Sequence, residues 1–301
     1  MKRKNLITIG TFDGVHCGHR HLFNRLDTMA AQHLLKPLVL YFPFPPKYVS
    51  NQPEMSILTP PAEKGRLLFD AGMQTVALDF NEVQNLTPEE FFKKLQKKYN
   101  MGGLLVGADF AFGKDRQGGV DFLRDQCARL KIPFEVVDFY KVGTQKVSSS
   151  LVRNTLAKGN IKEANALLGW NYKLTGRVVK GDKLGRKIGF PTANLDTGVY
   201  KILPLGVFAV RVRVGRKHYN GFCNIGFRPT VNKQNPQTPL VEVHIFDFHQ
   251  SIYGRDITIW FEDKLRNEQK FAGLDALKAQ LTKDQKAAQA LFSKLDKQKA
   301  Q

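Results

Sequence analysis

The sequence has few cysteines and no long apolar run. Cys17, Cys127 and Cys223 are its only cysteines, and they stand in unrelated contexts. They offer no disulfide framework, which fits a reducing compartment. No apolar stretch approaches the roughly 20 residues of a membrane-spanning helix. The basic start MKRKNLITIGTF has too few apolar residues for a signal peptide. We therefore expect a soluble cytoplasmic protein with no membrane partner.

The two commonest phosphate-loop patterns, GxxxxGK[ST] and GxGxxG, are also absent. The net charge of +19 suggests nucleic-acid binding as one option. However, no lysine/arginine block dominates and no nucleic-acid motif is present, so the alternatives are a basic face for small anionic substrates or a charge with no specific partner. With 301 residues and 42% hydrophobic content, the chain can bury a sizeable core in two domains.

The stretch LITIGTFDGVHCGHRH (6–21) combines a short apolar strand, a glycine turn and a helix that we expect to begin near His19. At such a junction, free N–H groups and the helix dipole favour a phosphate. His16 and His19 lie in this turn, where two imidazoles could donate hydrogen bonds to phosphate oxygens as charge develops. Gly18 between them allows a ligand to approach the backbone.

Two other interpretations of this turn stay open. A histidine pair near a helix start can simply be a solvated cap, with about even odds. A metal site made of His16, Cys17, His19 and His21 is less favoured. Structural zinc takes four ligands, usually from separated pairs, and no second Cys/His pair exists.

Strand and helix patterns alternate through the first half of the chain. Alternation of this kind predicts a doubly wound parallel sheet, whose ligands gather at the carboxyl ends of its strands. The opening turn and the loop ADFAFG (108–113) both lie at such ends. The expected strands span 36–42, 75–80, 104–107 and 134–137, and the expected helices span 64–69 and 121–130, with a third beginning at Thr87.

A second helix start is expected at Ser148–Ser150, with Arg153 one turn in. Hydroxyls, free amides and an arginine suit a triphosphate, although an ordinary serine cap would explain the same pattern.

The pattern changes near Gly169 to alternation with period two. Val210, Val212 and Val214 share one face, and further short alternating strands follow, which predicts a small antiparallel barrel. A helix is expected from Leu274 to Gln301, with a solvated lysine/glutamine-rich tail. The predicted fold class is therefore α/β with a doubly wound first domain (1–169) and a β-barrel second domain with a terminal helix (170–301).

Several motifs resemble one family. GTFDGVHCGH resembles the signature of the HxGH nucleotidyltransferases, and its FDGVH core is specific to the bacterial bifunctional riboflavin kinase/FAD synthetases. GFPTAN resembles the flavokinase PTAN signature. Other stretches resemble elements of this family in the same order over essentially the whole chain: SILTPPAEKGRLL, LVGADFAFGKDRQGG, VSSSLVR, NIGFRPT, VEVHIFDF and LRNEQKF.

This resemblance implies a kinase in the barrel that phosphorylates riboflavin with ATP to give FMN and ADP. Glu242 takes the position of the catalytic base. Thr192 and Asn194, whose hydroxyl and amide oxygens suit Mg²⁺, hold the magnesium-nucleotide. Arg228 and Arg266 are expected flavin contacts, whereas His244, Asp247 and His249 are read as structural. The loop expected over the phosphates contains Gly176, Gly181, Gly185, Gly189 and Pro191.

The resemblance implies an FMN adenylyltransferase in the first domain, which makes FAD and pyrophosphate from FMN and ATP. His16 and His19 would stabilise the reacting phosphate, and Asp109 and Phe110 would contact flavin. Flavins are then substrates and products, and Mg²⁺ is the expected cofactor. The other nucleotide-binding positions implied are Gly10, Thr11, Phe12, Asp13, Gly14, Gly18, Ser149, Ser150 and Arg153.

The chain departs from the family in this first domain. The usual TFDPHP is replaced by YFPFPP (41–46), so that Phe44 or Pro45 stands where the family has histidine. Ala111 replaces a basic residue that many relatives carry. A kinase with a vestigial or regulatory first domain is therefore an alternative, and a basic nucleic-acid-binding protein is a weaker one. The sequence leaves the oligomeric state open.

Overall fold

The computed structural model describes residues 3–46, 56–198, 201–227 and 239–299. Its contacts divide the chain into two compact units, Met1–Ser149 and Ser150–Gln301. This division falls earlier in the chain than the boundary after residue 169 expected from the sequence. None of the helices in the described ranges is long and apolar enough to cross a membrane.

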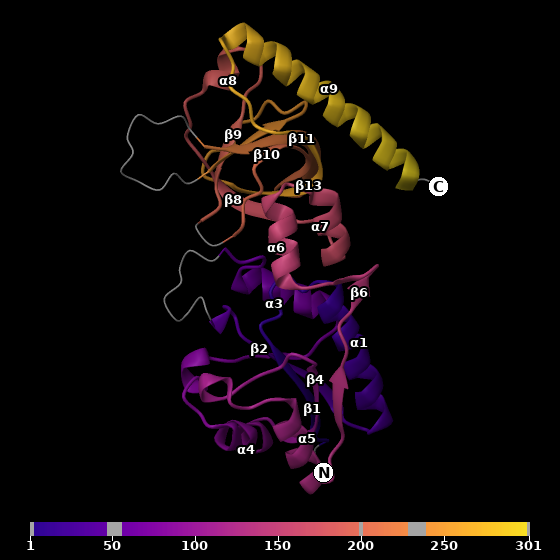
Figure 1. Cartoon of the computed structure of the whole chain (residues 1–301). Coiled ribbons are helices and arrows are strands. Elements are labelled where there is room, and N and C mark those ends of the chain that lie inside the picture. Colours follow the sequence, from indigo (N-terminus) through magenta and orange to yellow (C-terminus); the bar gives the residue numbers. More distant parts are fainter. Residues whose placement is uncertain (1–2, 47–55, 199–200, 228–238, 300–301) are drawn as a thin grey trace. The chain divides into compact units, whose positions relative to one another are not determined.

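The first unit is built on a five-stranded parallel sheet in the order β3-β2-β1-β4-β5, as predicted (Figure 1). The antiparallel pair β6 (Lys141–Val142) and β7 (Gln145–Lys146) follows the sheet. The sheet and its helices are β1 (Asn5–Gly10), α1 (Cys17–Gln32), β2 (Lys36–Tyr41), α3 (Pro61–Asp70), β3 (Thr75–Ala77), α4 (Pro88–Lys98), β4 (Met101–Gly107), α5 (Val120–Arg129) and β5 (Phe134–Val137).

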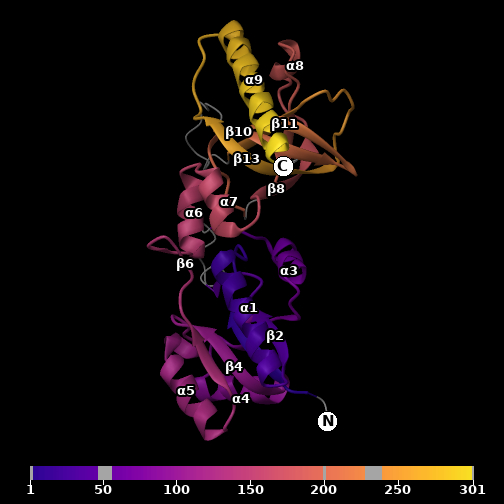
Figure 2. The same cartoon turned by 90° about the vertical axis from the view of Figure 1, so that its right-hand side faces the viewer.

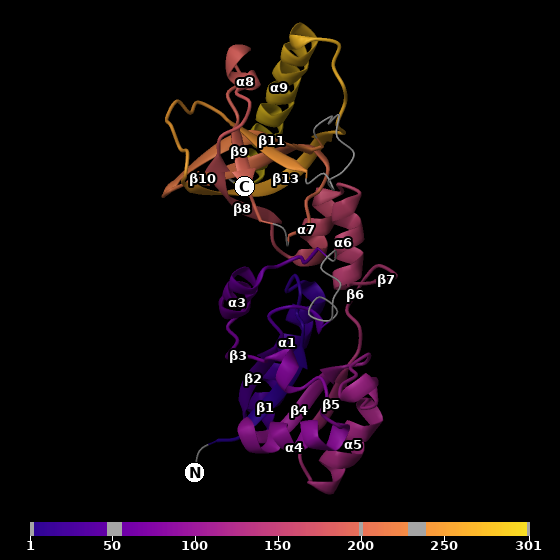
Figure 3. The ribbon, with the colours of Figure 1, turned by 90° about the vertical axis from the view of Figure 1, so that its left-hand side faces the viewer.

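One face of this sheet is covered by α4 and α5, whose apolar side chains pack with those of β1, β2 and β4 in one core cluster. Figure 3 shows α5 beside β4 and β5. α1 contacts β1, β2 and β4. The capping box predicted at the start of α4 is present, with Thr87 accepting from the Glu90 amide at 3.2 Å and the Glu90 carboxylate accepting from the Thr87 amide at 2.9 Å.

Several boundaries differ from expectation, and two of them have a local cause in the structure. α1 begins at Cys17 rather than near His19, because the side chain of His16 already caps it. β3 ends at Ala77 rather than at residue 80. There the Asp79 carboxylate accepts from the Asn81 amide and starts a short 3₁₀ helix, η1 (Phe80–Glu82). A second 3₁₀ turn, η2, spans Lys114–Arg116.

The second unit is a closed barrel in the order β10-β11-β12-β9-β8-β13, which confirms the predicted barrel. The hairpin of β10 and β11 turns at Gly215, whose φ of 60° favours glycine. The unit contains α6 (Ser149–Ala157), α7 (Ile161–Leu168), β8 (Lys173–Val179), α8 (Leu184–Lys187), β9 (Ala193–Asp196), β10 (Gly206–Val214), β11 (Lys217–Gly226), β12 (Leu240–Ile245), β13 (Asp256–Arg266) and α9 (Leu274–Lys299).

Two helical elements pack against the barrel. α9 lies along it and contacts β10, β11 and β13 (Figure 2). α7 packs on β13, where the Asn165 amide group donates to the Phe261 carbonyl at 3.0 Å and the Asn165 side-chain oxygen accepts from the Tyr172 amide at 2.8 Å. α7 is therefore part of the barrel unit by its contacts.

Candidate active sites

The predicted histidine pair is brought together at the start of α1. Nδ1 of His16 accepts from the His19 amide at 3.3 Å, and the two imidazole rings stack with centroids 3.5 Å apart. His16 is a helix cap, but it is buried rather than solvated. Because its Nδ1 accepts a hydrogen bond, neutral His16 carries its proton on Nε2, which makes Nε2 the donor.

His19 is held in its neutral form. Loss of hydration in this half-buried position, followed by the electrostatic influence of His16 and Lys64, places the pKa of His19 well below its ordinary value. A neutral imidazole keeps one N–H group, which can donate a hydrogen bond to a phosphate oxygen near pH 7.

The glycine turn is fixed by a segment far along the chain. The buried carboxylate of Asp13 accepts from the backbone amides of Leu58 and Thr59 at 3.0–3.1 Å and from the Thr59 hydroxyl. The Gly14 amide donates to the same hydroxyl at 2.9 Å. Asp13 and Gly14 are expected as nucleotide contacts. In the structure, the Asp13 carboxylate and the Gly14 amide hold the turn against Leu58 and Thr59. The sequence does not indicate a role for Thr59, although Thr59 lies in the stretch SILTPPAEKGRLL, which resembles an element of the family.

Close packing explains two further glycines. A Cβ at Gly10 would meet the Phe12 ring at 2.8 Å, and one at Gly18 would lie 3.1 Å from the His16 ring. Phe12 itself is buried and makes an edge contact with His19, at 5.2 Å between centroids. Phe12 therefore supports His19 from within the protein.

Beside the histidines lies a cavity of about 230 Å³. Its lining includes Asp109, Lys146 and Ser149 together with His16 and His19. Lys146 pairs with Asp109 at 2.9 Å and lies over the Phe139 ring, and Ser149 donates to the Asp13 carbonyl at 2.8 Å. The structure thus places Asp109 and Ser149 with the histidines, and it adds Lys146, which the sequence did not indicate. Ser150 and Arg153 lie on α6 in the second unit.

A second cavity of the first unit, of about 490 Å³, lies after β2 and β3. It is lined by Phe42, Phe44 and Phe80, so it coincides with the YFPFPP departure. Phe42 and Phe80 meet edge to face at 5.8 Å. Phe110, an expected flavin contact, stacks on Phe112 at 5.6 Å and packs on the same core cluster as these rings. The sequence does not predict this cavity, and the run FPFPP is the one local pattern that points to it.

In the barrel, strand register brings the predicted kinase residues together. Glu242 on β12 is paired with Asn194 on β9 and with Asn224 on β11. Thr192, Asn224 and Glu242 line one cavity of about 430 Å³, and Asn194 is buried. Glu242 is half-buried here rather than exposed. Burial and then the nearby charge of Glu242 raise the pKa of the Cys223 thiol well above its ordinary value.

The glycine loop lies directly against these residues. A Cβ at Gly181 would overlap the Asn194 side chain, one at Gly185 would overlap the Phe190 carbonyl, and one at Gly176 would meet the Asp196 carbonyl at 2.5 Å. Gly189 has a φ of 88°. Gly181 therefore allows the loop to pack closely against the Asn194 side chain, and Gly185 allows it to pack against the Phe190 backbone.

Arg266 lines the same cavity, but its guanidinium is bound within the protein. It donates three hydrogen bonds of 2.8–3.1 Å to the buried carboxylate of Asp284 on α9, and Nη1 donates to the Asn267 carbonyl at 3.0 Å. His244 has the structural setting expected for it, with Nδ1 2.8 Å from the Pro191 carbonyl and a pKa lowered mainly by burial. Arg228, the other expected flavin contact, lies outside the described residues.

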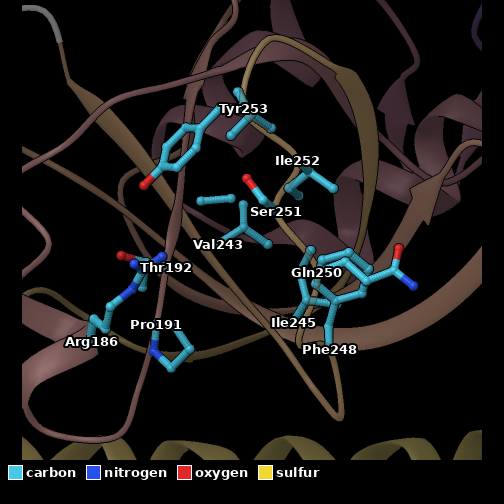
Figure 4. A pocket seen from close by; sticks show the side chains of 12 residues that line it. Arg186, Pro191, Thr192, Val243, Ile245, Phe248, Gln250, Ser251, Ile252 and Tyr253 are labelled. Atoms are coloured by element: carbon cyan, nitrogen blue, oxygen red, sulfur yellow. The ribbon is translucent and has the colours of Figure 1, made fainter.

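A smaller cavity of about 70 Å³ adjoins this region of the barrel. Figure 4 shows Arg186, Pro191 and Thr192 on one side of it, with Tyr253 nearby. Thr192 lines both barrel cavities. Within the described ranges, no group of three or more His, Cys, Asp or Glu side chains could hold a metal ion, so any metal here would depend on hydroxyl and amide oxygens as well.

A parallel-sheet unit with a histidine-bearing phosphate turn, followed by a barrel with a glycine loop and a cavity-lining carboxylate, defines a two-unit nucleotide-dependent transferase. The FAD synthetase family model matches residues 1–151, and the riboflavin kinase family model (Flavokinase) matches residues 168–292. The chain belongs to the family of bifunctional riboflavin kinases/FMN adenylyltransferases, which combine the two activities in one chain.

Curated relatives support this placement over nearly the full length. The bifunctional riboflavin kinase/FMN adenylyltransferase of Bacillus subtilis is 36% identical over 299 residues, covering 98% of this chain and 94% of its own. The Escherichia coli K12 protein of the same name is 39% identical, covering 95% and 92%. A crystal structure of a macrolide-efflux protein from Streptococcus pneumoniae matches with a TM-score of 0.85 and 31% identity, covering 96% of this chain and 95% of that one.

Proposed function

We propose that the barrel unit transfers the γ-phosphoryl group of ATP to riboflavin, and that the parallel-sheet unit transfers AMP from a second ATP to the resulting FMN. The observation that supports the kinase half best is the position of Thr192, which lines both barrel cavities, one of them shared with Glu242. That arrangement provides a place for two substrates to meet beside a base.

In the kinase step, the larger cavity takes the flavin, since its volume of about 430 Å³ suits a small-molecule site. The smaller cavity takes part of the nucleotide. Glu242 accepts the proton of the terminal ribityl hydroxyl as its oxygen bonds to the γ-phosphorus, and ADP leaves. Arg266 acts through Asp284, by holding the cavity wall, rather than by donating freely to flavin.

The family is ATP-dependent and its members generally require a divalent metal. Thr192 and Asn194 would hold Mg²⁺, because both offer hard oxygen atoms and the glycine loop lies tightly against Asn194. When bound, the ion neutralises charge on the phosphates. Thr192 and Asn194 orient the nucleotide, and Gly181 and Gly185 allow the loop to approach it closely.

In the adenylyl transfer, the cavity of about 230 Å³ takes the nucleotide phosphates. A phosphate oxygen of FMN bonds to the α-phosphorus of ATP, and the bond to the β-phosphate oxygen breaks, which releases pyrophosphate. His16 and neutral His19 donate hydrogen bonds to the reacting phosphate. Ser149, which lines this cavity, holds the leaving pyrophosphate in this proposal. The flavin ring lies among Phe42, Phe44 and Phe80.

The kinase-only alternative has one observation in its favour, the YFPFPP departure. Because that segment lines an aromatic cavity at the carboxyl end of the sheet, we favour a working flavin site there. We also propose 1–169 and 170–301 as the functional domains. The cytoplasmic location stays a prediction.

The test is to incubate the purified protein with riboflavin, ATP and Mg²⁺ and to separate FMN from FAD. We expect both products, and we expect FAD alone to form when FMN replaces riboflavin. Chelation of divalent ions should stop both reactions. Formation of FMN without any FAD would support the kinase-only alternative, and absence of both products would contradict the proposal. Steeply salt-dependent binding to nucleic acid would favour the third alternative.

A further inference from the structure

Lys64 is a fully buried lysine in the first unit. It lies in the first turns of α3, and its ammonium donates to the carbonyl oxygens of Phe42 at 3.0 Å and Pro43 at 2.9 Å. Burial of an ammonium group costs several kcal/mol unless it is well satisfied, and an apolar side chain would avoid that cost. The charge at this position therefore calls for an explanation beyond packing.

The two carbonyl groups belong to the segment directly after β2. Phe42 and Pro43 both line the aromatic cavity. The Phe42 amide donates to the Gly10 carbonyl at 3.1 Å, at the start of the histidine turn, whereas Pro43 has no N–H to donate. The Lys64 ammonium therefore holds both carbonyl groups of the Phe42–Pro43 segment, which has only one backbone N–H group to hold it from the other direction.

The same ammonium acts on the histidine turn. Two charged or titratable groups influence the pKa of His19, namely His16 at the start of the same helix and Lys64 on α3, and both lower it in addition to burial. One buried cation therefore influences both the rim of the aromatic cavity and the charge state of His19.

We infer that Lys64 is a positioning residue for adenylyl transfer, holding the Phe42–Pro43 backbone at the rim of the flavin cavity beside the histidine turn. The inference rests on the proposed function, since it assigns FMN to that cavity. Lys64 acts through the backbone carbonyls and through His19 rather than by touching the reacting atoms.

The experiment compares Lys64→Met, which keeps the length of the side chain and removes the charge, with Lys64→Arg, which keeps a cation. Lys97→Met, at an exposed lysine of α4, is the matched control for the loss of one positive charge. In the full chain we would measure kcat and KM for FMN over a range of pH, the riboflavin kinase rate, and the melting transition of the first unit.

We expect Lys64→Met to raise KM for FMN by about 10- to 100-fold and to move the acidic limb of the pH profile toward higher pH. Lys64→Arg should bring KM back to within about threefold of the parent value, and Lys97→Met should match the parent. The kinase rate should not change in any of the three, because that site lies in the other unit.

Two outcomes would overturn the inference while leaving the proposed function intact. One is a Lys64→Met protein that melts normally and retains the parent KM and pH profile. The other is loss of the cooperative transition of the first unit in both Lys64→Met and the milder Lys64→Gln, which would make Lys64 a folding residue only. Failure of the parent protein to make FAD would instead refute the proposed adenylyl transfer itself.

Discussion

In the barrel, the register of neighbouring strands brings Asn194 and Glu242 together, whereas in the parallel-sheet unit the histidine pair depends on contacts from distant segments. A closed ladder fixes each strand on both sides. The histidine turn contains Phe12 and Val15 at φ of 48° and 39°, a conformation that needs support from its surroundings. Glu242, the proposed base of the barrel, can therefore be changed alone, while a change at the histidine site also depends on the residues that support it.

The largest difference between the activities of the two units is expected from Glu242→Gln. This change removes the proton acceptor and keeps the shape, so FMN formation should fall by roughly 10²–10⁴-fold. Because the other unit carries the second reaction, the same protein should convert added FMN to FAD at the parent rate. Separating the products from riboflavin and from FMN measures both. A normal kinase rate would remove Glu242 from its assigned role.

The opposite difference, loss of FAD formation with the kinase activity retained, is expected from His19→Ala. Loss of one donor to a developing charge costs about 10²–10³-fold, so FAD formation should nearly stop while binding of ATP changes little. His21→Ala, at an exposed position of the same helix, is the matched control.

Mixing the two variants, each of which lacks one activity, tests whether the two reactions are carried by separate units. With riboflavin and ATP, His19→Ala supplies FMN and Glu242→Gln consumes it, so FAD formation should return. If each protein is folded and keeps its other activity but the mixture makes no FAD, then free FMN does not pass between molecules. That result would contradict the assignment of the two reactions to separate units.

The boundary between the units can be sharpened with two fragments. A fragment beginning at residue 150 keeps α7, whereas one beginning at 170 loses its contacts with β13 and its buried residues Ile161, Leu167 and Leu168. We expect the shorter fragment to melt on the order of 10 °C lower, since several buried side chains and hydrogen bonds are lost. Equal melting temperatures in calorimetry would show that α7 adds nothing to the barrel.

A smaller effect should distinguish the two aspartates that hold α9. Asp284 is buried against Arg266, whereas Asp296 is exposed against Arg211. Asp284→Asn should raise KM for riboflavin by about tenfold, because Arg266 in the cavity wall loses its charged partner. Asp296→Asn should change KM little. Kinase assays at varied riboflavin would measure this. Similar effects of both changes would mean that Arg266 does not organise the cavity.

The smallest effect concerns pH and the first unit. The pKa of His19 is lowered in the folded state, so below the ordinary value of 6.5 the unfolded chain binds a proton that the folded chain does not. Stability should therefore fall as pH drops below 6.5, by at most about 1.4 kcal/mol per pH unit from this group. Denaturation between pH 5.5 and 7.5 should show a shallower slope for His19→Gln. An unchanged slope would contradict this.

The sequence predicted most of the fold, because the relevant signals are local. Alternation marked the barrel strands, the Thr87–Glu90 pair marked the start of α4, and the apolar segments marked the parallel sheet. The error at β3 is also local in origin. Thr75–Phe80 has the apolar content of a strand, but the Asp79 side chain accepts from the Asn81 backbone amide and starts a 3₁₀ turn, so the strand ends early.

The histidine site was less predictable because its supports lie far along the chain. Thr59, Lys64 and Lys146 carry no pattern that links them to His19, and their roles follow only from the folded contacts. Arg266 shows the opposite difficulty. Its motif indicated flavin, but its partner Asp284 on α9 could not be inferred from spacing.

The attachment of α9 has a consequence for synthesis on the ribosome. Leu277 and Leu281 line the kinase cavity and Asp284 fixes its Arg266, so that cavity is incomplete until α9 has been made. The residues of the parallel-sheet unit emerge earlier, and domains generally fold as they emerge. A nascent chain can therefore assemble the site that consumes FMN before it can assemble the site that supplies it.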